Sequence, residues 1–346
     1  MNCMASPENK FIIAGSGRSG TTWVLDVLAT AGKYKTIFEP LHPGVSKVAE
    51  KYAGKYIRPD TQKLDIIEFM DVVLSGEIKS TWTDYRVVAD RLKPTLGVFH
   101  SLRLLFELFH RYKSLWNNYC KFKQKKHKGI AVKFIRANLM LGWLCGLYNI
   151  KTLFIIRHPG AVIESKIRLD AAALSAGLQH GTSDWDPRKV LNGYLNDENF
   201  CEDFLNRYID KLDFKTMTDL EVHTVNWCLE NAPVIEVAEK YNICITCYED
   251  LVENSELQWK KIINYLGLTL KYNELNINKP SQQASEDFKK LGTTEEKLSR
   301  WMGRFSDAEK DSIDKILNLF KVNLYSAYKY MPIGNMHDET SRDHSR

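Results

Sequence analysis

Apolar positions along the chain form short runs that alternate with segments of helical spacing. The first run, Phe11 to Ser16, ends in a glycine-rich turn and precedes Thr22 to Ala31, where apolar residues recur at helical spacing. The pattern recurs at Ile130 to Ile135 with Leu139 to Tyr148, at Lys151 to Ile156 with Pro159 to Leu169, and at Ile243 to Tyr248 with Leu257 to Leu266. Strands that alternate with helices are typical of a parallel sheet covered on both faces. We therefore predict an α/β fold with a central parallel sheet flanked by helices.

The pattern also indicates the domain organisation. We predict one domain over residues 1–334, interrupted by an insertion at about 44–129, and a disordered polar tail at 335–346. The insertion includes an aromatic, helix-like stretch at 101–119 and a basic run at 121–128. Residues 171–214 are polar and predicted to be irregular, as in a flexible cover over a binding site. Residues 306–324 are predicted to form a C-terminal helix, with Ser306 as N-cap and Glu309 completing a capping box.

Composition and charge exclude several classes of protein. The chain has 346 residues, 44% of them apolar, and its 48 basic and 43 acidic residues give a net charge of +5. This balance suits an anionic ligand but lacks the strong basic excess of a nucleic-acid binder. The sequence shows neither a long apolar stretch nor a signal-peptide pattern, and its seven cysteines lack the spacing of a disulfide framework. We expect a cytoplasmic protein in which Cys244 and Cys247 are buried core thiols.

The turn after the first strand carries an anion-binding motif. Gly15 and Gly20, followed by Thr21 and Thr22, nearly match the nucleotide triphosphatase pattern GxxxxGK[ST]. Glycines let backbone N–H groups converge on an anion, and the helix N-terminus adds partial positive charge. Thr21 stands where that pattern has a lysine, so a triphosphate would lose its main cation. Arg18 supplies a planar cation inside the loop, which favours a shorter tetrahedral oxyanion.

A second motif follows the strand Lys151 to Ile156. Arg157 comes directly after that strand, Pro159 is placed in the first turn of a helix, and Ser165 lies on the same helix. An arginine at the carboxyl end of the strand and a serine on the next helix can face one phosphate. An enzyme that uses ATP would need neither residue.

The two motifs together resemble those of the sulfotransferases, whose donor is 3′-phosphoadenosine 5′-phosphosulfate and whose nucleotide product is adenosine 3′,5′-bisphosphate. The resemblance implies a P-loop nucleotide-binding architecture, in which Arg157 and Ser165 hold the 3′-phosphate and no metal is needed. The implied 5′-phosphosulfate loop consists of Gly17, Arg18, Ser19, Gly20, Thr21, Thr22 and Trp23.

Glu39 is the candidate general base. It follows the strand-like residues 34–38 and lies 21 positions after Arg18, so a parallel sheet would bring both to the same edge. This spacing resembles that of the catalytic glutamate in the Golgi-type carbohydrate and tyrosyl-protein sulfotransferases, and the triplet Phe38-Glu39-Pro40 is most similar to the carbohydrate branch. A structural role for Glu39, neutralising Arg18, is compatible with a role as base. The sulfotransferases of phenols and steroids use a histidine instead, and His42 and His100 are the alternatives here.

Lys133 is predicted to act beside Glu39. It lies in an otherwise apolar strand, where a buried charge is costly unless it meets an anion. It resembles the family's K-x-x-R lysine, which approaches the sulfuryl and bridging oxygens, and Arg136 would then contact the acceptor or support the structure. Two further segments resemble family features: Tyr248-Glu-Asp-Leu251 is interpreted as structural, and Trp301 as part of a segment that closes over the nucleotide.

The resemblance implies transfer of a sulfuryl group to a hydroxyl, with Arg18, Lys133 and Glu39 as catalytic residues. A carbohydrate is the expected acceptor, and a lipid or other small-molecule alcohol is the alternative. Carbohydrate sulfotransferases usually carry a signal anchor and a stem, and this sequence shows neither, which favours a cytoplasmic location over the Golgi unless the chain is a truncated form. A small-molecule kinase and a nucleotide-binding protein without activity remain as rival hypotheses.

Overall fold

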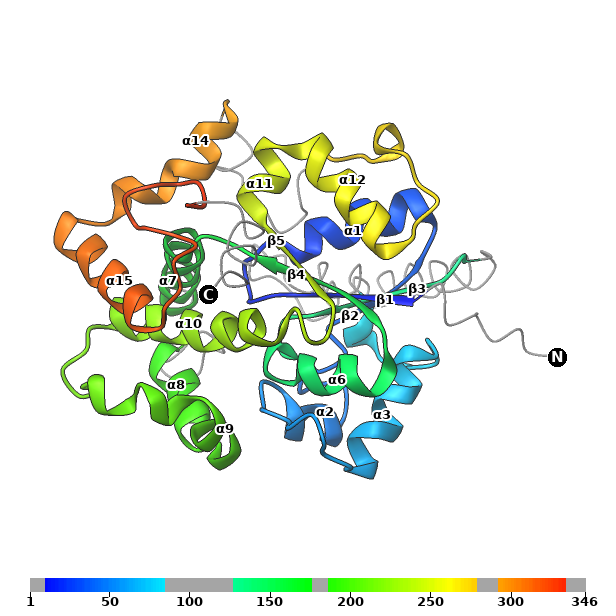
Figure 1. Ribbon diagram of the computed structural model, residues 1–346, viewed down its shortest axis with the longest axis horizontal. Helices are drawn as coiled ribbons and strands as arrows, with labels where there is room; N and C mark the ends of the chain where they lie inside the picture. Colours follow the sequence, from blue (N-terminus) through cyan, green and yellow to red (C-terminus); the bar gives the residue numbers. More distant parts are fainter. Residues whose placement is uncertain (1–9, 85–126, 176–185, 279–291, 334–346) are drawn as a thin grey trace, which may run out of the picture.

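The computed structural model describes residues 10–84, 127–175, 186–278 and 292–333, and the strands in these ranges form one parallel sheet (Figure 1). The strand order is β2-β3-β1-β4-β5, and every neighbouring pair is parallel. The strands are β1 (Lys10–Ala14), β2 (Lys35–Phe38), β3 (Ile130–Phe134), β4 (Lys151–Ile156) and β5 (Ile243–Cys247). The predicted α/β fold class is therefore confirmed.

Helices cover both faces of the sheet. The larger helices are α1 (Thr21–Gly32), α3 (Leu64–Leu74), α6 (Leu141–Tyr148), α7 (Pro159–Ser175), α10 (Asp219–Val237), α12 (Ser255–Leu266) and α15 (Asp307–Leu319). Helices α1 and α12 pack on one face, together with α11 (Tyr248–Glu253), whereas α3, α6, α7, α10 and α15 enclose a larger core on the other. Figure 1 shows α1 and α12 on the opposite side of the strands from α3 and α6.

The short helices complete the fold. They are α2 (Lys47–Tyr52), α8 (Pro187–Leu195), α9 (Glu198–Asp203) and α14 (Thr294–Ser299). The 3-10 turns are η2 (Thr81–Thr83), η3 (Asn138–Met140), η4 (Leu205–Arg207), η5 (Ile209–Lys211), η6 (Tyr272–Glu274) and η7 (Arg300–Arg304).

Strand β1 shows why these apolar runs form a central sheet. Successive side chains of a strand point to opposite faces, so an apolar run without polar interruption fits a strand buried on both sides. Ile12 and Ala14 belong to the larger core, while Phe11 and Ile13 belong to the core under α1, and all four are buried. The central position of β1 brings the loop that follows it between the loops that follow β3 and β4.

Some predicted boundaries differ from the structure. The C-terminal helix has the predicted capping box of Ser306 and Glu309, but α15 ends at Leu319, five residues before the predicted Leu324. The described part of 171–214 is mostly helical rather than irregular, because Asp186 and Asp197 cap α8 and α9. Helices α2 and α3 occupy the first part of the predicted insertion. The stretch 101–119, the basic run before His127, and the tail 335–346 lie outside the described residues.

The predicted core thiols are less buried than expected at one position. Cys247 is buried and Cys244 is half-buried, and neither forms a disulfide. Burial raises the pKa of both thiols, which keeps them protonated and poorly nucleophilic. Among the described helices, none combines the length and apolar character needed to cross a membrane.

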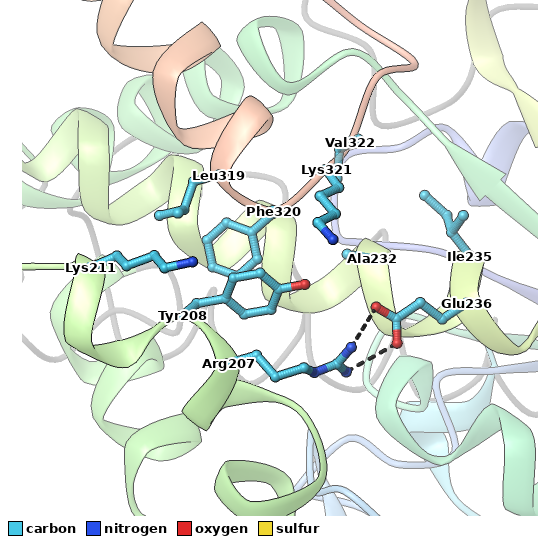
Figure 2. A pocket seen from close by; sticks show the side chains of 10 residues that line it. All are labelled: Arg207, Tyr208, Lys211, Ala232, Ile235, Glu236, Leu319, Phe320, Lys321 and Val322. Atoms are coloured by element: carbon cyan, nitrogen blue, oxygen red, sulfur yellow. Dashed lines mark hydrogen bonds and ion pairs between the residues drawn. The ribbon is translucent and has the colours of Figure 1, made fainter.

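A pocket of about 350 Å³ lies between α10, the turns η4 and η5, and the chain that follows α15 (Figure 2). Arg207 and Glu236 form a bidentate ion pair at one side of it, with N–O distances of 3.1 and 3.0 Å. The rings of Tyr208 and Phe320 line the pocket and are tilted relative to each other, with their centres 4.4 Å apart. No residue that the sequence predicts for the active site lines this pocket.

Candidate active site

The predicted site residues gather at the carboxyl ends of the parallel strands. Because β1 pairs with both β3 and β4, the first loop, Gly15–Gly20, lies between the ends of those two strands. The crossover from β1 to β2 and the crossover from β3 to β4 run in opposite directions along the sheet, and open α/β sheets bind ligands at such a switch point. Glu39 follows β2, which pairs with β3 in the register Phe38 to Lys133.

The first loop ends in a left-handed glycine. Gly20 has φ 88° and is the N-cap of α1, which begins at Thr21, and the N-terminus of a helix is suited to bind an anion. Ser19 is fully buried, and its hydroxyl has no hydrogen-bond partner among the described residues. Buried polar atoms are nearly always paired, so a hydroxyl in this state indicates a site for a ligand atom.

Gly20→Ala is expected to destabilise the protein and to weaken anion binding by the first loop. A Cβ at this position would lie 2.5 Å from the Tyr248 ring, and the left-handed conformation adds about 1–2 kcal/mol of strain for a residue with a side chain. Denaturant unfolding and calorimetric binding of adenosine 3′,5′-bisphosphate measure both effects.

Gly193→Ala is the matched control for this substitution. Gly193 lies within α8 and has open space around it, so alanine should stabilise the helix by about 0.5–1 kcal/mol. Equal stability changes in the two variants would contradict the account of Gly20.

Two hydrogen bonds join the first loop to the second motif. The Arg18 Nε donates to Ser165 Oγ at 2.9 Å, and Arg157 Nη1 donates to the carbonyl oxygen of Arg18 at 3.1 Å. Arg18 holds this position with φ 76°, an unusual backbone conformation for a residue with a side chain. Pro159 is the first residue of α7, as predicted, and this helix carries Ser165. The two motifs therefore form one basic site.

The Arg157 side chain lies on an aromatic surface. Its guanidinium is 4.5 Å from the centre of the Tyr248 ring, and its Nε is buried without a partner among the described residues. As for Ser19 Oγ, a buried donor in this state indicates a site for a ligand atom that accepts its hydrogen bond.

Glu39 and Lys133 form a buried ion pair beside the first loop. The Lys133 Nζ is 2.6 Å from Glu39 Oε1, and both side chains are nearly inaccessible to solvent. Glu39 Oε2 accepts the N–H of Ile135 at 3.1 Å and lies 3.6 Å from Arg136 Nη1. The anionic partner that a buried Lys133 requires is thus Glu39, which has Arg136 as a further charged neighbour.

The electrostatic surroundings lower the pKa of Lys133. Burial is the main cause, since it disfavours the charged ammonium, and the positive charges of Arg136 and Arg18 act in the same direction. The carboxylate of Glu39 opposes these effects. Lys133 is therefore a cation whose charge depends on the anions around it.

Of the two candidate histidines, one lies beside this site. His42 stacks on Trp82 with ring centres 4.1 Å apart, and its Nδ1 accepts the N–H of Gly44 at 3.0 Å. His42 N donates to the carbonyl of Glu39, which ties this ring pair to the candidate base. His100 lies outside the described residues.

Helix α10 contributes residues that the sequence did not single out for this purpose. Asn231 Nδ2 donates to Ser16 Oγ at 3.0 Å, so α10 holds the start of the first loop. Trp227 is buried and donates its Nε1 to the carbonyl of Arg157 at 3.1 Å. These pairs lie 215 and 70 positions apart in the chain, and no local pattern marks them.

His158 is a neutral residue inside the second motif. Its side chain is fully buried, and its Nδ1 accepts the N–H of Gly160. The ring proton is therefore assigned to Nε2, which donates to the carbonyl of Ser326 at 3.1 Å. Burial lowers its pKa to about 3. Trp301, predicted to close over the nucleotide, is itself buried and stacks on His158 at 4.1 Å.

The stability of the protein is expected to fall as the pH is lowered below about 6.5. His158 and His223 both have folded pKa values of about 3, lowered from 6.5 by burial, so the unfolded chain takes up their protons first. Below pH 6.5, each histidine therefore lowers the free energy of unfolding by about 1.4 kcal/mol per pH unit. Together they lower it by about 4 kcal/mol between pH 7.5 and 5. Denaturant unfolding at the two pH values measures the difference.

His223→Asn should remove about half of this pH dependence, because asparagine does not titrate. An unchanged pH dependence in this variant would contradict the assignment of a neutral, buried His223.

A comparison with known protein families identifies the chain. The family model described as a sulfotransferase domain matches residues 8–311, which include every described site residue named above. The chain belongs to the sulfotransferase domain family. No curated protein sequence matches this sulfotransferase.

Several solved structures resemble this sulfotransferase at low sequence identity. The sulfotransferase domain of the olefin synthase of Synechococcus PCC 7002 is 14% identical, with a TM-score of 0.40 over 90% of this chain and 94% of that chain. The sulfotransferase domain from the curacin biosynthetic pathway is also 14% identical, with a TM-score of 0.40 over 90% of this chain and 98% of that chain. A mouse sulfotransferase complexed with PAP is 13% identical, with a TM-score of 0.41 over 92% of this chain and 87% of that chain.

The described site of this sulfotransferase combines several cations with one carboxylate. Arg18, Arg157, Lys133 and Arg136 lie around or next to the first loop, and Glu39 is the acid among them. Within the described ranges, no cluster of three or more histidine, cysteine, aspartate or glutamate side chains could hold a metal ion. The arrangement can bind a ligand with more than one anionic group and place a proton acceptor beside it.

Proposed function

We propose that this sulfotransferase moves the sulfuryl group of 3′-phosphoadenosine 5′-phosphosulfate to an acceptor hydroxyl, with Glu39 as the general base. The observation that carries the proposal is the joining of two phosphate-binding motifs by the 2.9 Å bond from Arg18 to Ser165. The ion pair of Glu39 and Lys133 lies at the same edge of the sheet.

The residues present fit a donor with phosphate groups at two positions. Residues Gly17 to Trp23, which comprise the end of the first loop and the start of α1, would bind the 5′-phosphosulfate through helix amides and Arg18. Arg157 and Ser165 would hold the 3′-phosphate. The unpaired Ser19 Oγ and Arg157 Nε give the donor two further buried contacts, one in each motif.

In the proposed reaction, Glu39 removes the proton of the acceptor hydroxyl. The hydroxyl oxygen bonds to sulfur as the bond from sulfur to the phosphate oxygen breaks, and that electron pair leaves with adenosine 3′,5′-bisphosphate. Lys133 and Arg18 stabilise the negative charge that develops on the leaving phosphate. The ion pair with Lys133, at 2.6 Å, also holds the Glu39 carboxylate in place.

We propose a carbohydrate hydroxyl as the acceptor. The stacked rings of His42 and Trp82 adjoin Glu39, and flat rings suit the apolar face of a sugar. A lipid or other small-molecule alcohol is the alternative. A cytoplasmic location is proposed as well, since the five described cysteines are unpaired, as is usual in a reducing compartment.

Transfer from a radiolabelled sulfuryl donor to a panel of sugars, glycolipids and simple alcohols tests the proposal. We expect labelled product with at least one sugar, and adenosine 3′,5′-bisphosphate should displace the donor much more effectively than ATP. Stronger displacement by ATP would favour a small-molecule kinase. Tight binding of the bisphosphate without transfer to any acceptor would favour a nucleotide-binding protein without activity.

A further inference from the structure

The second phosphate loop, defined here as Arg157–Gly160, is held in place by hydrogen bonds to its main-chain atoms. The Trp227 indole donates to the carbonyl of Arg157 at 3.1 Å, and the N–H of His158 donates to Glu249 Oε1 at 3.0 Å. The N–H of Gly160 donates to His158 Nδ1 at 3.1 Å. The loop that carries Arg157 therefore depends on residues far from it in the sequence.

Glu249 joins this loop to the C-terminal part of the chain. Its side chain is 2% exposed, and while Oε1 accepts the N–H of His158, Oε2 accepts the Tyr325 hydroxyl at 2.8 Å. The two bonds span 91 and 76 positions of sequence. The carbonyl oxygen of Ser326, the residue after Tyr325, accepts a hydrogen bond from His158 Nε2. A buried carboxylate with both oxygens occupied fixes its partners strongly, because each lost bond leaves a buried polar group unpaired.

Aromatic packing prevents the loop from shifting to compensate for a lost bond. Trp301 stacks on the His158 ring at 4.1 Å, and Tyr325 meets the same ring edge-on at 4.8 Å. Gly160 lies so close beneath the Trp301 ring that a Cβ there would overlap it. Close-packed interiors of this kind move little when one contact changes.

The same short segment also holds the Arg157 side chain. Tyr248 lies under the Arg157 guanidinium at 4.5 Å, and Glu249, the next residue, bonds the main chain of His158. Adjacent residues of α11 thus hold both the side chain of Arg157 and the peptide that follows it. This arrangement fixes the direction of the Arg157 side chain, whose Nη1 donates to the carbonyl of Arg18.

We propose that Glu249 and Tyr325 are positioning residues for the second phosphate loop, and that their hydrogen bond sets the selectivity of this sulfotransferase for nucleotides with a 3′-phosphate. The inference rests on the proposed function, because it requires Arg157 and Ser165 to bind that phosphate. Glu249 and Tyr325 act through the peptide of His158.

Calorimetric binding of two nucleotides to wild type and variants tests the inference. The ratio of the dissociation constants of adenosine 5′-monophosphate and adenosine 3′,5′-bisphosphate measures the selectivity for the 3′-phosphate. Tyr325→Phe removes the hydroxyl and keeps the ring, so we expect the dissociation constant of the bisphosphate to rise about tenfold. Binding of the monophosphate should remain within about twofold, since the first loop is unchanged. The KM for the donor should rise with little change in kcat.

Glu249→Gln provides the second variant. Its amide oxygen can still accept the N–H of His158, and its NH₂ group can donate to the Tyr325 oxygen, which reverses the direction of that hydrogen bond. We expect Glu249→Gln to lower the selectivity less than Tyr325→Phe does. The double variant should lose more than the sum of the two, because the buried NH₂ group then lacks the hydroxyl oxygen. Additive losses would contradict the inference.

Tyr265→Phe is the matched control. The Tyr265 hydroxyl bonds the carbonyls of Thr152 and Asn242 near the start of β4, at the other end of that strand. Its loss should lower stability without changing the selectivity. If Tyr325→Phe and Glu249→Gln weaken both nucleotides by the same factor, or leave both unchanged, the inference is wrong. If wild type itself does not prefer the bisphosphate, the proposed function fails instead.

Discussion

Glu39→Gln is expected to lower the rate of sulfuryl transfer by about 10²- to 10⁴-fold and to leave the binding of adenosine 3′,5′-bisphosphate intact. Glutamine has nearly the shape of glutamate and can still accept the N–H of Ile135, now bonded to Glu39 at 3.1 Å. It cannot remove a proton from an acceptor hydroxyl. Single-turnover transfer measures the chemical step, and calorimetry measures binding of the bisphosphate.

The substitution also removes the charge partner of Lys133, so a control for this second effect is needed. Glu230→Gln serves, because Glu230 lies 3.4 Å from the buried Lys166 without being a candidate base. We expect Glu230→Gln to lower transfer less than tenfold. Loss of bisphosphate binding in Glu39→Gln would overturn the assignment of Glu39 as base and would make it a structural partner of the cations.

Arg18→Ala is expected to slow transfer by about 10²- to 10³-fold, the usual effect of removing one donor that stabilises developing charge. Its guanidinium bonds Ser165 in the second motif and contributes to the positive potential around Lys133. Arg18→Lys should recover only part of the loss, because an ammonium lacks the planar fork that matches a tetrahedral oxyanion. Steady-state kinetics with varied donor concentration measures both variants.

Two controls separate this effect from changes in the backbone and in overall charge. Arg18→Gly suits the φ of 76° at this position, so a loss equal to that of Arg18→Ala would show that the missing cation is responsible. Arg207→Ala removes an arginine from the pocket in Figure 2, where it pairs with Glu236, and should leave transfer nearly unchanged. Wild-type rates in Arg18→Ala would exclude a catalytic role.

For Lys133, the sequence predicts the need for a partner but not which residue it is. A lysine in an apolar strand requires an anionic partner, and this much follows from the cost of burying a charge. The identity of the partner does not follow, because Glu39 comes directly after another strand and its contact depends on the register of β2 against β3. The structure pairs Glu39 with Lys133 and Arg136, which no local pattern indicated.

Helical segments of the predicted cover show a second limit. Residues 187–195 and 198–203 are rich in polar residues, so their apolar spacing is weak. They nevertheless form α8 and α9, because Asp186 and Asp197 cap them and Leu191, Tyr194 and Phe200 are buried against the larger core. Tertiary packing of a few apolar side chains outweighed a polar composition.

The sequence alone determined the parallel sheet and the positions of the two predicted anion-binding motifs, together with Glu39 at the same edge as the first. These are local properties: strand-like runs, glycines in turns and the first residues of helices, each readable within about ten positions. Only the tertiary structure decided that Arg18 bonds Ser165, 147 positions away, and that Glu249 ties the second phosphate loop to Tyr325. Such contacts depend on how distant segments pack and on which buried polar groups must find partners, and neither is encoded in local spacing.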